Sequence, residues 1–193
     1  TSAQGTIVSL PITLSVKPLI CPAGPVGDLS IEIKSPDDDE EFNQGETISL
    51  ETEVQNNGND DMDVFVEAIL YNLDEGRTVA SVRSSSVRID EDDEHTFTLD
   101  LLISGTAVSD DDSYAIYARA YEDNADDEQC QTVTQDVAID QQTFYLVVAQ
   151  TTVHPQPALC GQQVEVDMQV RNEGKEDVTA VLSVLSPFGG ESQ

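Results

Sequence analysis

The sequence contains no tryptophan, only five phenylalanines and five tyrosines, and only 8 basic residues against 38 acidic ones in 193 residues. The formal net charge of -30 would repel nucleic acid and anionic membrane surfaces, so we exclude both as partners. No run of about 18 apolar residues occurs, and no signal-like segment opens the chain. We therefore expect a mature or excised soluble piece without direct membrane insertion, whose secretion signal or anchor lies outside it.

Recognisable catalytic patterns are also missing. His95 and His154 have no acid or nucleophile at a recognisable spacing, and neither a G-x-S-x-G motif nor a P-loop occurs. Paired carboxylates are so abundant that their presence discriminates nothing. We predict a protein that is not an enzyme and assign no catalytic residue.

The negative charge is concentrated in the middle of the chain. Residues 1–27 carry a net charge of +1, residues 28–140 carry -27, and residues 141–193 carry -4. The stretch 141–164 contains no Asp, Glu, Lys or Arg. In a chain this acidic, neutral strands are expected to be shielded from water.

Short runs of alternating apolar and polar residues predict an all-β protein. In residues 28–140 these runs have the spacing of an antiparallel β-sandwich of the immunoglobulin-like kind. The predicted strands are 28–34, 47–56, 63–73, 78–89, 95–103, 114–121 and 132–139. The expected core residues are Leu29, Ile31, Ile33, Ile48, Leu50, Val54, Val64, Val66, Ala68, Leu70, Phe97, Leu99, Leu101, Ile103, Ile116, Ala118, Val137 and Ile139.

An internal repeat indicates a second domain of the same type. Residues 45–61 (GETISLETEVQNNGNDD) align without gaps on residues 161–177 (GQQVEVDMQVRNEGKED), at an offset of 116 residues. By the measure of the first domain, the second begins near Gln141 and includes only about three strands, too few to bury a sheet face. We divide the chain into an N-terminal strand (1–20), a linker (21–27), an acidic first sandwich (28–140) and a partial second sandwich (141–193).

The repeated pattern has a turn glycine, a strand with Ile or Val at alternate places, and the motif V-x-N-x-G-x-[DE]-D. It resembles the CARDB-type or S-layer-type β-sandwich domains of archaeal and bacterial surface proteins. The stretches 28–48, 121–130 and 160–174 are also similar to tandem-domain surface proteins of archaea. The resemblance covers roughly residues 28–186; it implies a surface structural role and supplies no catalytic residues.

Acidic clusters fall in the predicted loops and at strand ends. Simple strand alternation places loops 57–62, 90–94 and 123–129 at one end of the first domain, and loops 36–46, 74–77 and 104–113 at the other. Oxygen ligands at this density suit Ca²⁺, whereas the alternative is a solvated or salt-adapted surface, because no EF-type loop is present. The candidate calcium ligands are Asp60, Asp61, Asp90, Asp92, Asp93, Asp123, Asp126 and Asp127.

The three cysteines include no C-x-x-C pair, which argues against structural zinc. Cys21 precedes the first strand of the acidic domain and Cys130 opens its seventh, so both lie at the same predicted end. We predict a Cys21–Cys130 disulfide, with free thiols as the alternative. The partner of Cys160 would be a missing segment, another chain or nothing.

The N-terminal strand alternates strictly from residue 8 to residue 16. Because Pro11 cannot donate to a ladder, this strand is expected at a sheet edge. We hypothesise that it completes a sheet of a neighbouring subunit by strand addition; the alternative is that it ends a preceding domain of a longer protein. The side chains that would fill the neighbour's groove are Val8, Leu10, Ile12, Leu14 and Val16.

Two classes of function follow from these patterns. The first is a non-enzymatic structural subunit of an extracellular cell-surface assembly, a lattice or a filament, whose partners are copies of itself. The second is a calcium-tuned adhesin or binding module of a larger surface protein, with other surface proteins as candidate partners.

Overall fold

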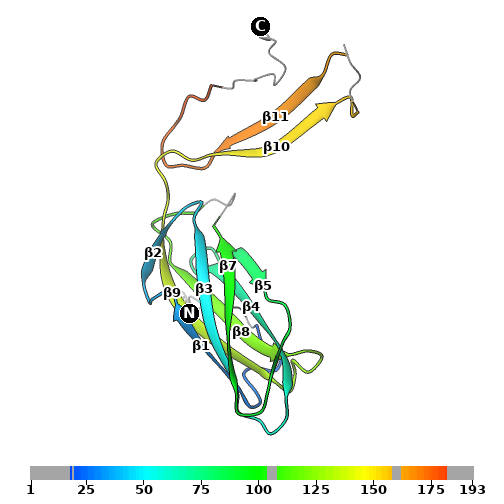
Figure 1. Ribbon diagram of the computed structural model, residues 1–193. Helices are drawn as coiled ribbons and strands as arrows, with labels where there is room; N and C mark the ends of the chain where they lie inside the picture. The colour runs from blue at the N-terminus through cyan, green and yellow to red at the C-terminus, as the bar shows by residue number, and fades with distance from the viewer. Residues whose placement is uncertain (1–17, 19, 104–107, 158–161, 182–193) are drawn as a thin grey trace, which may run out of the picture.

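The computed structural model describes residues 18, 20–103, 108–157 and 162–181, in which every regular element is a β-strand. Eleven strands follow in chain order (Figure 1). They are β1 (Leu29–Ser35), β2 (Glu40–Asn43), β3 (Thr47–Asn56), β4 (Met62–Asn72), β5 (Arg77–Arg83), β6 (Val87–Ile89), β7 (Glu94–Leu102), β8 (Tyr114–Glu122), β9 (Cys130–Asp140), β10 (Leu146–His154) and β11 (Glu165–Asn172).

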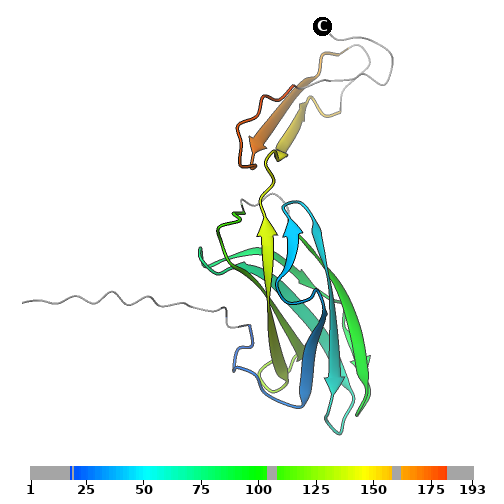
Figure 2. The same ribbon diagram turned by 90° about the vertical axis from the view of Figure 1, so that its left-hand side faces the viewer.

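The first nine strands form a sandwich of two sheets. One sheet has the order β1-β3-β7, and the other has the order β2-β9-β8-β4-β5, with β6 also pairing with β4. All pairs are antiparallel except β2 with β9, which run parallel. Figure 2 shows the two sheets packed face to face. This arrangement confirms the predicted all-β, immunoglobulin-like sandwich.

Alternating burial explains how these residues form the two sheets. Every second side chain is buried along β3 and also along β4. Because these strands belong to different sheets, the apolar residues of both sheets meet in one core. Of the residues expected in the core, all are buried except Ile31, which is partly buried against it. Strand β8 differs, because residues of both its faces are buried, including Tyr114, Tyr117 and Tyr121.

Three predictions about the first domain were wrong. The strand predicted at 78–89 is divided into β5 and β6. Ser84 N still donates to the carbonyl of Val66 (2.8 Å), but Val66 N donates to the side-chain Oγ of Ser84 (2.9 Å), and the register with β4 shifts by one residue before β6. Strand β2 lies in a predicted loop, where the short acidic run 40–43 pairs with β9. The segment 21–27, predicted to be a linker, is fastened to the start of β9 by a main-chain bridge between Val26 and Cys130.

The repeat is present in the structure as the same hydrogen-bonded turn. Asn56 Nδ2 donates to the carbonyl of Asp60 (2.9 Å), and its Oδ1 accepts from Gly58 N (2.9 Å). At the offset of 116 residues, Asn172 Nδ2 donates to the carbonyl of Glu176 (2.8 Å) and its Oδ1 accepts from Gly174 N (3.1 Å). Strand β11 therefore ends as β3 ends, so the sequence repeat is also a structural one.

Asn56 has further partners that its counterpart lacks among the described residues. Its Nδ2 also lies 3.2 Å from the carbonyl oxygens of both Ile89 and Asp90, and its side chain is fully buried. Replacing Asn56 by Ala leaves these buried carbonyls unsatisfied and should lower the free energy of unfolding by about 3 kcal/mol. The measurement is urea denaturation; Asn172→Ala, at an exposed position, is the matched control and should cost under about 1 kcal/mol. Equal losses in both variants would contradict this assignment.

Candidate assembly surface

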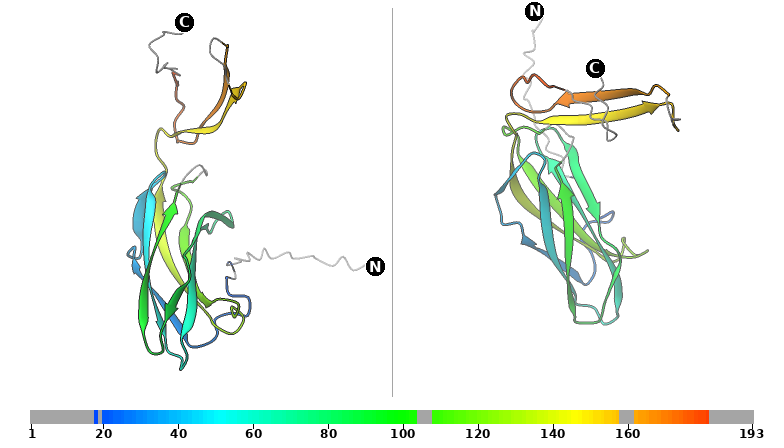
Figure 3. Two further views of the ribbon diagram at one scale, coloured as in Figure 1. Left: turned by 45° about the vertical axis from the view of Figure 1, so that its right-hand side comes forward. Right: turned by 45° about the horizontal axis from the view of Figure 1, so that its top comes forward.

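Strands β10 and β11 form an antiparallel hairpin beyond the end of the sandwich at which β9 finishes (Figure 1). The pairing runs from Leu146 opposite Asn172 to His154 opposite Glu165, with an irregularity between Val148 and Gln150. Within the described residues no third strand pairs with either of them, as the views of Figure 3 also show. As far as residues 18–181 are described, the hairpin therefore has no pairing strand at either edge and no sheet over either face.

One face of this hairpin is apolar and exposed. By the repeat, Val164, just ahead of β11, and Val166, Met168 and Val170 of β11 take the places that Ile48, Leu50, Thr52 and Val54 have in β3. The four residues of the first domain are fully buried, whereas their counterparts are 37–45% exposed. Leu146 and Val148 of β10 lie opposite Asn172 and Val170 and extend the same face. We call the set Leu146, Val148, Val164, Val166, Met168 and Val170 the hairpin face.

The hairpin is attached to the sandwich by polar contacts near its base. Lys175 Nζ lies 2.9 Å from an Asp110 carboxylate oxygen and 3.1 Å from one of Asp140. These hydrogen bonds raise the pKa of Lys175, and the bond from Lys175 lowers the pKa of Asp110. The side-chain amides of Gln141 and Gln44 both donate to the carbonyl of Glu173, at 2.9 and 3.3 Å. The base of the hairpin is therefore held against the sandwich, while the hairpin face stays open.

At the opposite end of β9, the predicted disulfide between Cys21 and Cys130 is present, with a Cα–Cα distance of 5.9 Å and both cysteines fully buried. Tyr121 and Phe65 pack around it, so the bond lies on the outer face of the larger sheet. Residues 21–26 are therefore attached to Cys130, the first residue of β9, by the disulfide and by the main-chain bridge from Val26. The predicted strand from Val8 to Val16, and Cys160, lie outside the described residues.

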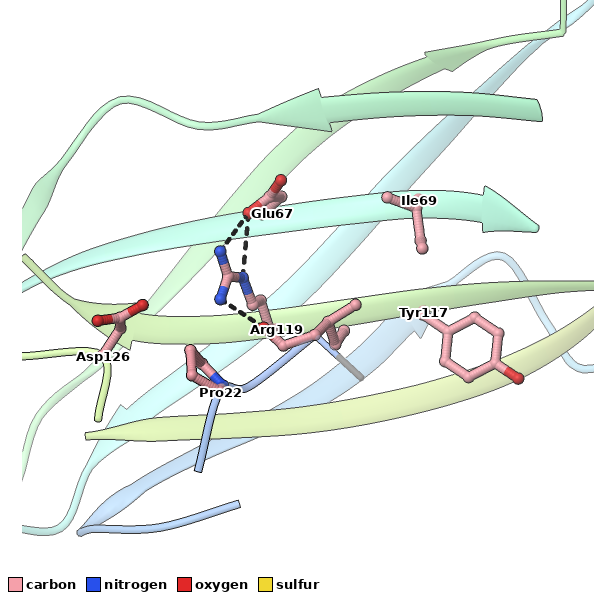
Figure 4. Close-up of a pocket in the computed structure, with 7 residues that line it drawn as sticks. Pro22, Glu67, Ile69, Tyr117, Arg119 and Asp126 are labelled. Atoms are coloured by element: carbon pink, nitrogen blue, oxygen red, sulfur yellow. Dashed lines mark hydrogen bonds and ion pairs between the residues drawn. The ribbon is translucent and has the colours of Figure 1, made fainter. Parts of the chain in front are cut away.

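A hollow of about 350 Å³ adjoins this attachment (Figure 4). Arg119 donates from Nε and Nη2 to one Glu67 oxygen at 3.0 and 2.7 Å, and from Nη1 to the carbonyl of Ile20. Its guanidinium also lies 4.3 Å from the Tyr121 ring centre. Through its bond to Ile20, Arg119 holds the chain just ahead of Cys21 against the sheet. Because its other named donors are bonded to Glu67, it offers few free donors to a small ligand. No sequence pattern predicted this cluster.

Three of the acidic loops, which contain the candidate calcium ligands, lie at one end of the sandwich as predicted. Loops 57–62 and 90–94 meet at Asn56, and Asp123 N donates to the carbonyl of Asp63, so these loops share one end. In the described part of the chain, no group of three or more acidic, His or Cys side chains is placed to hold a metal ion. Asp61 instead pairs with Arg88 at 2.7 Å, a hydrogen bond that lowers the pKa of Asp61. Calcium binding by these residues stays a prediction.

Glu122, the last residue of β8, has a raised pKa at this end of the sandwich. Burial raises the pKa of its carboxyl, and the charges of Asp63, Glu128 and Asp60 raise it further. Because the folded state holds the proton more tightly than the unfolded state, the stability from this group is present below the unfolded value of 4.5 and is lost as pH rises through the folded pKa.

Glu122→Gln should therefore gain stability relative to the natural protein as pH is raised from 4 to 8, because the neutral amide does not ionise. The measurement is the urea midpoint of both proteins at each pH. Glu51→Gln, at an exposed position of β3, is the control. A stability difference that shrinks as pH rises would contradict the assignment.

No family model and no curated protein matches this chain. Among solved structures, the CARDB domain of a Pyrococcus furiosus protein is similar at 21% identity over 60% of this chain and 96% of that domain, with a TM-score of 0.41. A crystal structure of the same domain, in complex with di-metal ions, is 18% identical over 61% of this chain and 92% of that one, with a TM-score of 0.37.

Two larger proteins contain similar sandwiches. The sporulation control protein of Bacillus subtilis is 13% identical over 68% of this chain and 62% of its own, with a TM-score of 0.43. A β-glucuronidase of glycoside hydrolase family 2 is 14% identical over 65% of this chain, with a TM-score of 0.38, and this chain covers only 12% of the enzyme. The strand order described above defines an immunoglobulin-like β-sandwich protein, and these neighbours bring no activity to it.

Proposed function

We propose that this chain is a non-enzymatic structural subunit of an extracellular cell-surface assembly, a lattice or a filament formed by copies of itself. The observation that carries the proposal is the hairpin face, whose residues are 37–56% exposed. The β3 positions equivalent to four of them, Val164, Val166, Met168 and Val170, are buried in the first domain. An apolar patch with this shape needs a covering partner.

Charge and covalent chemistry agree with this proposal. The stretch 141–164 is free of Asp, Glu, Lys and Arg, so the repulsion between copies that a net charge of -30 produces is weakest there. The Cys21–Cys130 disulfide is compatible with an extracellular protein, because such bonds persist in oxidising compartments. In the described residues no helix is long and apolar enough to cross a bilayer.

Electron microscopy of the purified chain, in calcium and in chelator, tests the proposal. Ordered polymers are expected, and monomers under every condition would contradict it. Val170→Asp places a charge on the hairpin face and should abolish the polymers, because an unpaired carboxylate cannot be buried there at neutral pH. Gln169→Asp adds the same charge on the neighbouring residue, whose side chain points to the other face, and should leave the polymers intact.

The second candidate function is a calcium-tuned adhesin or binding module of a larger surface protein. The observation that favours it is the meeting of loops 57–62, 90–94 and 123–129 at one end of the sandwich. Glu122 lies there, partly buried, near the charges of Asp63, Glu128 and Asp60, and a bound cation would relieve their repulsion. Under this function the chain stays monomeric, and calcium raises its unfolding midpoint. Polymers that form equally well in chelator would exclude calcium control.

A further inference from the structure

We propose that residues 8–16 of a second copy pair antiparallel with the free edge of β11, in the place that β7 takes beside β3. This inference rests on the proposed function and deepens it, because it names the occupant of the open site, its direction and its register. It connects two features of the chain: the neutral alternating segment 8–16, and the β10–β11 hairpin, whose β11 edge has no pairing strand among the described residues.

At the edge of β11 that does not pair with β10, the exposed N–H and C=O groups belong to residues of the hairpin face. Glu173 N donates to the carbonyl of Tyr145 at 2.8 Å, so the odd-numbered residues near this end of β11 direct their N–H groups toward β10. The N–H and C=O groups of Val166, Met168 and Val170 consequently point to the opposite edge, where the described residues include no strand. Main-chain groups and an apolar face are thus open on the same side.

The first domain shows what fills an edge of this kind. There β7 pairs with β3, with Leu99 opposite Leu50 and Leu101 opposite Ile48. Asn56 N donates to the carbonyl of Asp93 (3.0 Å) and Ile103 N donates to that of Glu46 (2.9 Å), so the inward-facing residues of both strands form the hydrogen-bonded pairs. An occupant of the β11 edge needs the same pattern: antiparallel, with apolar residues at alternate positions.

The N-terminal strand has this pattern over the required length. In β7 and just after it, the inward side chains Phe97, Leu99, Leu101 and Ile103 alternate with outward residues. In the N-terminal strand Leu10, Ile12, Leu14 and Val16 alternate with Pro11, Thr13 and Ser15. Matching Ile12 to Leu99 and applying the β3–β7 register through the repeat places Ile12 opposite Val166 and Leu10 opposite Met168.

Pro11 fits this placement. In the β3–β7 pair only the inward-facing residues of β7 direct their N–H groups to β3, and β7 is itself an edge strand. Pro11 occupies an outward-facing position, so its missing N–H would have pointed away from β11 and no ladder bond is lost. A proline at residue 10 or 12 would have removed such a bond.

The strand must come from another copy, because its own chain holds it too far away. Cys21 is bonded to Cys130 at the start of β9, and β9 has 11 residues, which span roughly 33 Å before the hairpin begins. In antiparallel pairing Val16 would lie at the far end of β11, beyond that distance (Figure 1). The five residues from Val16 to Cys21 reach at most about 18 Å. The contact therefore joins the Cys21 end of one copy to the hairpin of the next, which is a head-to-tail interface that can repeat from copy to copy.

Disulfide trapping tests the occupant and the register. In this register Thr13 and Glu165 are directly opposite in a pair without main-chain hydrogen bonds, with Cα atoms about 4.5 Å apart, within the range of a disulfide. Two chains of different size, one with Thr13→Cys and one with Glu165→Cys, are mixed under oxidising conditions, both carrying Cys160→Ser. We expect a covalent heterodimer, and Gln150→Cys on β10 in place of Glu165→Cys should reduce its yield at least tenfold.

The outcomes separate the two proposals. Polymers without a Thr13–Glu165 heterodimer, or with equal trapping at residue 150, would overturn this inference and leave the structural function standing. Monomers under every condition would overturn both.

Main-chain chemistry gives a second, independent readout. A synthetic peptide of residues 6–18 should cap β11 and block polymerisation of the chain. N-methylation of that peptide at Ile12 should abolish the block, while N-methylation at Thr13 should preserve it, because only the first N–H faces β11. Equal effects at both positions would contradict the pairing.

Discussion

A chain lacking residues 1–16 should remain folded and lose the capacity to polymerise. Residues 20–140 contain the described strands of the sandwich and the disulfide, so the deletion removes no contact described in the core. It does remove five apolar side chains that would cover the hairpin face of another copy. At about 25 cal/mol per Å² these side chains contribute on the order of 5 to 10 kcal/mol to association before ordering costs.

The lower end of that range, about 5 kcal/mol, corresponds to a loss of more than about a thousandfold in the association constant. Sedimentation velocity and electron microscopy at matched concentrations are the measurements. Deleting only residues 1–5, which lie ahead of the alternating strand, is the control and should leave the polymers unchanged. Polymerisation of the shortened chain would show that strand donation is wrong.

Loss of the Cys21–Cys130 disulfide should have the largest effect on stability of any change in the first domain. The bond joins residues 109 positions apart, and closing a loop of this length stabilises the folded state by about 4.7 kcal/mol in the chain-entropy model. Replacing both cysteines by serine also buries two hydroxyls beside Tyr121 and Phe65, where the bond is fully enclosed.

We therefore expect the double serine variant to unfold at a clearly lower urea concentration, with a loss of about 3 to 5 kcal/mol in the free energy of unfolding. Cys160→Ser is the control and should unfold as the natural chain does. An unchanged midpoint in the double variant would mean that the bond does not constrain the unfolded chain.

Features that depend on local patterns could be predicted from the sequence. Alternation along 47–56 or 95–103 is a property of one segment, so strand positions and inward-facing residues follow from it directly. The disulfide followed because simple strand alternation places Cys21 and Cys130 at one end. The repeat likewise identified the hairpin positions whose equivalents are buried in the first domain.

Features that depend on distant partners could not be predicted. The acidic run 40–43 becomes a strand only because the backbone of residues 137–140 lies beside it in parallel register. Arg119 lies on a strand with no charge pattern, and its role follows from Glu67 across the sheet and from the carbonyl of Ile20. The acidic loops do meet at one end, but loop direction decides which carboxylates converge, and composition carries no information about direction.

The two attachments of β9 have a mechanical meaning in a filament of such subunits. A pull on the N-terminal strand enters β9 through sulfur at Cys130, passes along one continuous stretch of backbone to Asp140, and leaves into β10. This path consists of the disulfide and the backbone of β9. The other eight strands of the sandwich lie outside it, so tension along it would not separate the two sheets. Under reducing conditions the same force would instead run through residues 22–129 and unravel the fold.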